Sequence, residues 1–242
     1  MTGLKVTVPA LTLQSPAGGL DPDANRAYAR RAARTWLDLF LISGTIGGGE
    51  SNTPAQRHEL LRIWADELPT DRLLAGCWAP EDLDHAQDLG IRPISVLRGH
   101  ETPSALLNHL AGLPSDAFVY SHPKYTPVTL TADIANTARS LDRLPAGGKI
   151  CKVSLTEVTA LRSAAGPDFQ LYDGRCRHLA SSQAAGATGV IAVPLAHLPT
   201  DLPPHEDLPA LQSLIDHGQA LIDDRPNLAD RITLLTELLR LP

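Results

Sequence analysis

Two residues in this sequence could do carbonyl chemistry, an amine and a phenol that each end a short apolar segment. Lys152 closes the segment Gly147-Gly148-Lys149-Ile150-Cys151-Lys152, and Tyr120 closes the segment 116–120. A lysine that is withdrawn from water without a neighbouring carboxylate has a lowered pKa, and its neutral amine condenses with a ketone to form a Schiff base. The structural alternative is a lysine at a strand end whose ammonium group reaches solvent.

The pattern around Lys152 is typical of a strand that is buried on both faces. Side chains alternate along a strand, so Ile150, Lys152 and Ser154 would share one face, and Cys151 and Val153 would share the other. We therefore expect Lys152 to lie among buried side chains at the end of its strand.

A glycine-rich segment, GTIGGGESNTP over residues 44–54, follows the apolar run 36–42. A loop of this kind between a strand and a helix exposes backbone N–H groups that can bind a carboxylate or a phosphate. The spacing matches neither the phosphate-binding GxxxxGK[ST] loop nor GxGxxG. An ordinary flexible turn is the alternative interpretation.

These candidates must be positioned by a fold in which strands and helices alternate. We expect strands over residues 6–8, 36–42, 72–77, 91–97, 116–120, 148–152, 169–172 and 189–193. We expect helices over 22–34, from 54 onward, and over 80–88, 102–110, 132–141, 156–165, 175–185, 208–222 and 228–239. The order predicts an α/β fold, a closed (β/α)8 TIM barrel with a short C-terminal helical extension; an open doubly wound sheet is the alternative. In a barrel, the glycine-rich segment, Tyr120 and Lys152 all follow strand ends on the catalytic face.

Composition narrows the class of protein. The chain has 242 residues, 43% of them apolar, and a net charge of −6 without a basic cluster, so we expect neither a nucleic-acid partner nor a membrane partner. Cys77, Cys151 and Cys176 are odd in number and widely spaced, which favours free thiols in the cytoplasm, and no secretory signal is evident. The scattered histidines predict no metal site, and we expect no cofactor. We assign residues 1–200 to the barrel core and 201–242 to C-terminal helices that pack on it.

The segments GTIGG, LLAGCW, YSHPKYT, GGKICKVS and FQLYDGRCRHLASSQAAGATGVIA, in this order, resemble the dihydrodipicolinate synthase and N-acetylneuraminate lyase family of class I aldolases. The resemblance runs from about Leu4 to Val193 and indicates a shortened and diverged member. It implies that Lys152 forms the Schiff base and that Tyr120 transfers protons. It also implies that Thr45, with Gly44 and Gly47, binds the carboxylate of a pyruvate-like 2-oxo acid.

Departures from the family pattern fall where a second substrate would bind. Ile46 replaces the second threonine of the family loop, Gly48 replaces its glutamate, and Tyr125 stands where synthases commonly have an arginine. These changes argue against the synthase reaction itself. The substrate-binding residues that the resemblance implies are Gly44, Ile46, Gly47, Gly48, Arg98, His100, Lys124, Tyr125, Gly174 and Val193. For Arg98, His100, Lys124 and Tyr125, a role as solvated loop residues is the alternative.

The sequence therefore predicts a lyase that makes or breaks a C–C bond beside the carbonyl of a 2-oxo acid. A Schiff-base dehydratase or decarboxylase of a sugar or keto acid, and an inactive ligand-binding barrel, stay open as alternatives. The expected partners are a small 2-oxo acid and, for an aldolase, an aldehyde acceptor. The family resemblance also suggests a homo-oligomer, although the C-terminal extension is shorter than usual.

Overall fold

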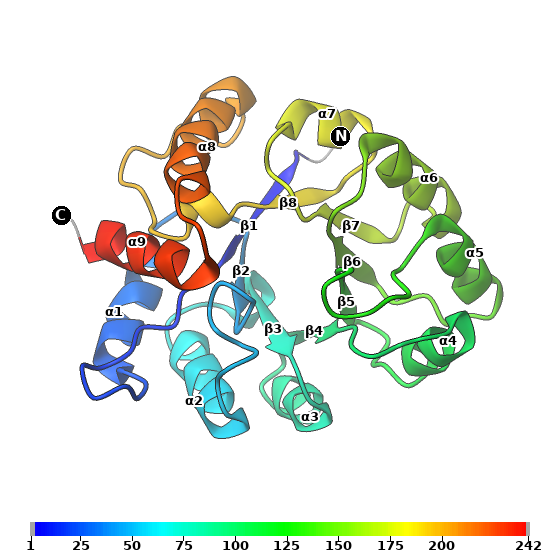
Figure 1. Ribbon diagram of the computed structural model, residues 1–242, viewed down its shortest axis with the longest axis horizontal. Helices are drawn as coiled ribbons and strands as arrows, with labels where there is room; N and C mark the ends of the chain where they lie inside the picture. The colour runs from blue at the N-terminus through cyan, green and yellow to red at the C-terminus, as the bar shows by residue number, and fades with distance from the viewer. Residues whose placement is uncertain (1–2, 241–242) are drawn as a thin grey trace. The chain divides into compact units, whose positions relative to one another are not determined.

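Eight parallel strands form a closed barrel in the order of the chain, as seen in the computed structural model, which describes residues 3–240 (Figure 1). The strands are β1 (Lys5–Pro9), β2 (Leu39–Ile42), β3 (Leu73–Cys77), β4 (Arg92–Val96), β5 (Phe118–Ser121), β6 (Gly147–Ile150), β7 (Gln170–Asp173) and β8 (Gly189–Ile191). The predicted (β/α)8 fold is confirmed.

Helices alternate with these strands and continue beyond the last one. They are α1 (Pro22–Ala33), α2 (Pro54–Ala65), α3 (Pro80–Asp88), α4 (Pro103–Ala111), α5 (Ala132–Ser140), α6 (Leu155–Ala165), α7 (Leu179–Ala184), α8 (Leu208–Asp223) and α9 (Leu228–Arg240). Short 3-10 turns are η1 (Thr70–Arg72) and η2 (Val193–Leu195). Among residues 3–240, no helix combines the length and apolar character needed to cross a membrane.

Local sequence signals determine where several helices begin. At α1, the Asp21 side chain accepts a hydrogen bond from the Ala24 amide, and proline occupies the first turn. At α2, Thr53 and Gln56 form a reciprocal capping box before a proline-initiated helix. Such caps satisfy N–H groups that the helix leaves unpaired, which fixes its first residue.

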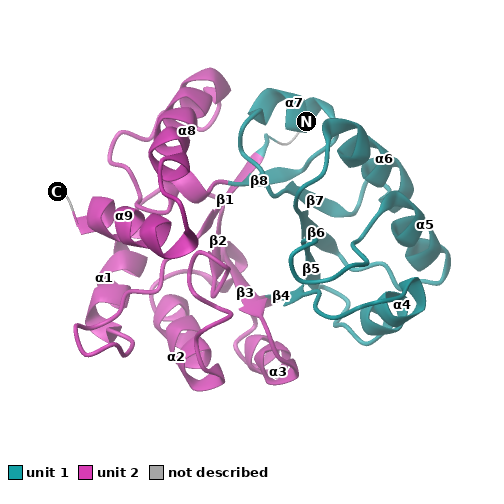
Figure 2. Ribbon diagram, in the orientation of Figure 1, with its two compact units in different colours: residues 1–4, 93–191 teal, residues 5–92, 192–242 magenta. Residues whose placement is uncertain are grey.

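The chain divides into two compact units, shown in teal and magenta in Figure 2. Unit 1 comprises Met1–Leu4 and Pro93–Ile191; unit 2 comprises Lys5–Arg92 and Ala192–Pro242. In unit 1, buried residues such as Val119 and Leu171 pack against helix residues such as Leu106 and Val158. In unit 2, the Trp64 ring packs against the Tyr28 ring at 5.2 Å and the Phe40 ring at 5.4 Å between centroids. The assignment of 1–200 and 201–242 to separate domains stays a prediction.

Three element boundaries differ from the sequence expectation in ways that matter for the site. β6 ends at Ile150 and not at Lys152, β2 begins at Leu39 and not at Trp36, and α7 begins at Leu179 and not at Arg175. At β6 the cause is local: the Cys151 amide still donates to the Ser121 carbonyl, but Lys152 adopts a left-handed backbone conformation with φ of 62°. The chain turns there, so strand alternation stops.

Candidate active site

Lys149 occupies the third position of β6 and is the buried amine at the centre of unit 1. It stands in register with Tyr120 of β5 on one side and with Tyr172 of β7 on the other. Partners in register on parallel strands direct their side chains to the same face of a sheet. Lys149 is 6% exposed, Tyr120 is 5% exposed and Tyr172 is 1% exposed, so this face is the packed interior.

The surroundings of Lys149 destabilise its ammonium form. Burial lowers the pKa of Lys149 below that of an ordinary lysine, and Coulombic interactions with Cys151 and Tyr125 raise it by less. The Nζ atom lies 4.0 Å from the centroid of the Tyr120 ring. Within residues 3–240, this amine makes no hydrogen bond or ion pair with a carboxylate. An amine in such a setting is available as a nucleophile.

The predicted burial of Lys152 is wrong. Lys152 lies beyond the last residue of β6, and its side chain is exposed to solvent. Lys149 and Lys152 differ by three positions, so even a longer strand would have directed them to opposite faces. The physical argument for a Schiff base at Lys152 required withdrawal from water, and that argument transfers to Lys149.

The rings of Tyr120, His122 and Tyr125 lie close together at the end of β5 and in the loop that follows it. The Tyr120 ring contacts the His122 ring at 6.1 Å and the Tyr125 ring at 5.8 Å, both in edge-to-face geometry. Lys124 places its ammonium 4.8 Å from the Tyr125 ring centroid and 3.5 Å from the Tyr125 hydroxyl. Burial lowers the pKa of His122, and the charges of Lys149, Lys152 and Lys124 lower it further. The structure thus brings Tyr120, Lys124 and Tyr125 together, and their roles in catalysis and substrate binding stay predictions.

Cys151 and Gly174 lie against each other beside this cluster. A Cβ added to Gly174 would come within 2.2 Å of the Cys151 Sγ, so only glycine fits there without displacement. Burial raises the pKa of the Cys151 thiol; the charge of Lys149 and a hydrogen bond from Tyr120 oppose that shift. Close packing against Cys151 therefore places Gly174 beside the cluster that contains Lys149 and Tyr120.

The buried carboxylate of Asp173 is engaged away from Lys149. Its Oδ1 accepts from the Arg175 amide at 2.9 Å, and its Oδ2 accepts from the Ser182 hydroxyl at 2.7 Å. The Arg175 Nε lies 3.7 Å from Oδ1. These contacts fix residues 174–178 as a loop, which explains the late start of α7.

In unit 2, the glycine-rich loop after β2 is held by its own backbone and by two side chains. The Gly48 and Gly49 amides donate to the carbonyls of Thr45 and Gly44. The Gly47 carbonyl accepts hydrogen bonds from the Thr12 hydroxyl at 2.5 Å and from the buried Asn52 amide at 3.3 Å. Gly44, Ile46 and Gly47 are buried, and Thr45 and Gly48 are half-buried. The loop is a fixed structure and not a flexible turn.

A buried ion pair holds this loop through hydrogen bonds to its backbone carbonyls. Arg57 and Asp82 are 6% and 4% exposed, and their side chains meet through the Arg57 Nε and Nη2 at distances of 2.9–3.1 Å. Arg57 also donates from Nη1 to the carbonyls of Asn52, at 2.5 Å, and Gly49, at 3.4 Å. Asp82 in turn accepts from the Trp78 and Ala79 amides. The pair therefore connects the ends of β3 and of the glycine-rich loop.

The remaining predicted substrate-binding residues lie in loops. Arg98 is exposed after β4. His100 is half-buried, its ring lies 4.7 Å from that of His109, and burial lowers its pKa. Val193 begins η2 after β8. Their contact with a substrate stays a prediction.

Sequence reasoning missed Lys149, Arg57 and Asp82. The sequence did contain one indication that Lys149 is buried, namely the two glycines, Gly147 and Gly148, that precede it. A Cβ at Gly147 would approach the Gln170 carbonyl within 2.6 Å, so paired glycines mark a position deep in the packed barrel. The Arg57–Asp82 pair joins residues on different helices, and no spacing rule indicates such a contact.

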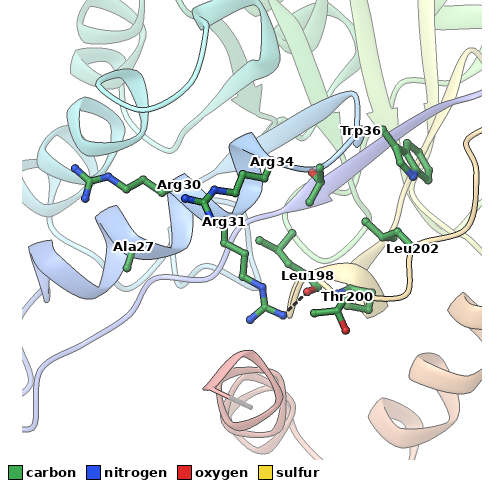
Figure 3. A pocket seen from close by; sticks show the side chains of 10 residues that line it. Ala27, Arg30, Arg31, Arg34, Trp36, Leu198, Thr200 and Leu202 are labelled. Carbon is green, nitrogen blue, oxygen red and sulfur yellow. Dashed lines mark hydrogen bonds between the residues drawn. The ribbon is translucent and has the colours of Figure 1, made fainter. Parts of the chain in front are cut away.

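A hollow in unit 2, of about 610 Å³, lies between the end of α1 and residues 198–202 (Figure 3). Thr35 and Trp36, which line it, precede β2, so this hollow is at the N-terminal end of that strand. Arg31, which also lines it, donates to the carbonyls of Leu198 at 2.6 Å and Leu239 at 3.0 Å. Active sites of barrels lie at the opposite strand ends.

Solved structures of aldolases and a synthase-family protein share this fold, although no family model and no curated protein matches the sequence. A protein from Coccidioides immitis that is assigned to the dihydrodipicolinate synthase family is 20% identical, with a TM-score of 0.79 over 99% of this chain and 88% of that one. A variant of the Sulfolobus solfataricus 2-keto-3-deoxygluconate aldolase is 17% identical, with a TM-score of 0.79 over 98% and 86%. The sialic acid aldolase of Ruminococcus gnavus is 16% identical, with a TM-score of 0.73 over 97% and 79%. At these identities the likeness shows the fold.

Proposed function

We propose that this chain is a Schiff-base-forming lyase of the dihydrodipicolinate synthase and N-acetylneuraminate lyase family, with Lys149 as the reacting amine. It makes or breaks the C–C bond beside the carbonyl of a pyruvate-like 2-oxo acid. The observation that carries this proposal is the environment of Lys149: a buried amine with a lowered pKa, without a carboxylate partner, against the face of a tyrosine. The aldolases that share the fold support the same class of reaction.

Lys149 acts first in this mechanism. Its neutral Nζ attacks the ketone carbon of the 2-oxo acid, and loss of one water molecule leaves an iminium. A base then removes the proton of the hydroxyl group on the β carbon, the bond between the α and β carbons breaks, and the β carbon leaves as an aldehyde. The electron pair of the broken bond forms the C=C bond of an enamine and neutralises the iminium nitrogen. Protonation of the enamine and hydrolysis of the iminium release the shortened 2-oxo acid and restore the amine.

Tyr120 transfers the protons of this sequence. Its ring lies beneath the Lys149 Nζ, so its hydroxyl is carried by a side chain that already borders the reacting nitrogen. General acid–base catalysis requires a group within hydrogen-bonding reach of the reacting atoms, directly or through one water molecule. The hydrogen bond of Tyr120 to the Cys151 thiol orients that hydroxyl before substrate binds.

The glycine-rich loop binds the substrate carboxylate in this proposal, through Thr45 and the backbone N–H groups of Ile46 and Gly47, which make no hydrogen bond within residues 3–240. The support is its rigidity: the Gly47 carbonyl, the Gly48 amide and the Gly49 amide are all engaged inside the loop. A site that needs no reordering on binding loses less affinity to entropy. Ile46 is 6% exposed and supplies no hydroxyl, so one family contact is absent. The aldehyde acceptor and a homo-oligomer stay predictions.

Reductive trapping tests the proposal. The protein is incubated with pyruvate and sodium borohydride, and the modified peptide is identified by mass spectrometry. We expect an adduct on Lys149 in the wild type and in Lys152→Ala, and none in Lys149→Ala. An adduct on Lys152 alone, or none with any of several 2-oxo acids, would remove this function. Product analysis then separates C–C cleavage from dehydration or decarboxylation.

A further inference from the structure

The hollow of about 610 Å³ at the end of α1 has no role in the proposed lyase reaction. It lies within unit 2 at the N-terminal end of β2, whereas the catalytic groups of a barrel lie at the C-terminal ends of the strands. Its volume falls in the range of small-molecule sites. A molecule bound in it would therefore be a ligand other than the substrate of Lys149.

Three arginines at the end of α1 line this hollow, and no acidic residue among residues 3–240 lines it. Arg30 and Arg31 stand in the last turn of the helix, and Arg34 is its C-terminal cap. Asp201, which stands between two lining residues in the sequence, is exposed and does not line the hollow itself. A hollow bordered by positive charge alone attracts anions, so its ligand should carry a negative charge.

The three guanidinium groups differ in how far protein groups already occupy them. Arg30 donates from Nε to the Glu67 carboxylate at 3.0 Å, and Arg31 donates to two main-chain carbonyls. The Arg34 guanidinium makes no hydrogen bond or ion pair within the described residues 3–240. A guanidinium carries five N–H donors, so Arg34 offers all of its hydrogen-bonding capacity to a ligand.

Other side chains already bind the carbonyl groups at the end of α1, which are the usual partners of an arginine at a helix C-terminus. The Arg72 guanidinium donates to the carbonyls of Ala33 at 3.4 Å and Thr35 at 3.1 Å. The Thr35 hydroxyl donates to the Ala32 carbonyl at 2.8 Å. These bonds also meet the negative end of the helix dipole. Capping of α1 therefore does not account for Arg34.

The wall opposite the arginines is apolar and is ordered by its own contacts. Figure 3 shows Trp36 and Leu202 there, across the hollow from the arginine side chains, and both are half-buried. The Trp36 indole donates to the Pro203 carbonyl at 2.8 Å and packs edge-to-face on the His205 ring, with 4.9 Å between centroids. An apolar wall that is already fixed loses less affinity to ordering when a ligand packs on it.

We propose that this hollow binds an organic carboxylate with an apolar body: Arg34 binds the carboxylate, and Trp36 and Leu202 contact the apolar body. A carboxylate presents two oxygens that match the fork of one guanidinium, and Arg34 is the lining arginine whose guanidinium has no partner within residues 3–240. Arg31 adds positive charge beside it. The inference does not depend on Schiff-base chemistry, because no lining residue of the hollow belongs to unit 1.

Calorimetric titration with 2-naphthylacetate tests the site, because this probe joins a carboxylate to an apolar aromatic body. The amide 2-naphthylacetamide keeps the shape without the charge, and acetate keeps the charge without the rings. We expect each of these two compounds to bind the wild type at least tenfold more weakly than 2-naphthylacetate. Equal affinity for the acid and either of them, or no binding of the acid, would overturn the inference.

Substitution of Arg34 locates the bound carboxylate. Arg34→Gln should lower the affinity for 2-naphthylacetate at least tenfold, and Arg34→Lys should restore part of it, because the charge returns without the planar fork. Arg225→Gln is the matched control and should bind as the wild type does, since Arg225 is exposed and does not line the hollow. Equal affinity in Arg34→Gln and Arg225→Gln would contradict the assignment.

Competition separates this site from the catalytic one. A saturating concentration of pyruvate should leave the affinity for 2-naphthylacetate unchanged, because pyruvate binds at Lys149. Displacement of the probe by pyruvate would place it at the catalytic lysine and would overturn the inference. Failure of borohydride trapping at Lys149 would remove the proposed lyase function, and the titrations of wild type and Arg34→Gln would still decide whether the hollow binds a carboxylate.

Discussion

The Nζ of Lys149 lies 4.0 Å from the centre of the Tyr120 ring, and the two residues are direct partners in the register of β5 and β6. A ring face attracts a cation, by about 2 kcal/mol when the pair is desolvated. Burial acts in the opposite direction and lowers the pKa of Lys149. An iminium formed at this nitrogen would keep the attraction to the ring, since it is also a cation.

Two substitutions of Tyr120 distinguish the role of its ring from the role of its hydroxyl group. Tyr120→Phe keeps the ring face and removes the proton-transfer group, so we expect trapping with pyruvate to persist while kcat falls by roughly 10²–10⁴. Tyr120→Leu removes both, so the yield of trapped adduct should fall as well. Trapping yield and steady-state kcat measure the two effects. Wild-type turnover in Tyr120→Phe would exclude Tyr120 as the proton-transfer group.

Removal of the buried amine should stabilise the protein in a pH-dependent way. The unfolded chain holds the Lys149 proton up to its ordinary pKa of 10.5, whereas the folded chain releases it at a lower pH. The unfolded state therefore binds more protons between these two values, and the stability of the wild type rises with pH across that window. Lys149→Met should raise the free energy of unfolding most at neutral pH, and this gain should shrink toward pH 10.5.

Urea unfolding of wild type and Lys149→Met at several pH values measures this difference. Lys152→Met, at an exposed position, is the matched control and should show no such trend. A gain that is constant between neutral pH and pH 10.5 would mean that the amine is not destabilised by burial in the folded protein.

The alternation of strands and helices was predictable because its signals are local. Asp21 with Pro22, and Thr53 with Gln56, cap their helices through contacts within one turn. The position of the reacting lysine was not predictable, because it depends on the residue at which β6 ends. That end is set by the left-handed turn at Lys152, and an apolar pattern that continues to Val153 gives no sign of it.

The candidate site was predictable in part for a related reason. Tyr120, Lys124 and Tyr125 lie close together because they share one strand end and its loop. Arg57 and Asp82 come together from different helices, and the contact depends on the packing of α2 beside α3. Residues joined only by tertiary packing leave no periodic signal in a single sequence.

The Arg57–Asp82 pair should affect both stability and substrate binding. Asp82→Asn leaves the Arg57 charge buried without a full counter-charge, which we expect to cost roughly 3 kcal/mol of stability. Because Arg57 holds the Gly49 and Asn52 carbonyls, the KM for a 2-oxo acid should also rise. Arg57→Met/Asp82→Leu should recover part of the stability but not the KM.

Urea unfolding and the pyruvate dependence of trapping provide the two measurements. Glu67→Gln is the control, because the side chains of its partners Arg26 and Arg30 are 34% and 62% exposed, so solvent screens both ion pairs and their loss should have little effect on stability. A loss of stability in Asp82→Asn with an unchanged KM would show that the pair supports the fold without positioning the glycine-rich loop.

Gly49→Ala tests the loop conformation directly. A Cβ at this position would lie 1.9 Å from the Ser43 carbonyl oxygen and 2.2 Å from the Trp78 Nε1, and neither can move easily because they hydrogen-bond to each other at 2.7 Å. We expect a loss of about 1–3 kcal/mol of stability and a raised KM for pyruvate in trapping. Gly19→Ala, where no atom lies within 4 Å of the added Cβ, should leave both quantities near wild type. If Gly49→Ala binds pyruvate normally, the backbone of this loop does not hold the carboxylate, and the 2-oxo acid must be oriented by other groups.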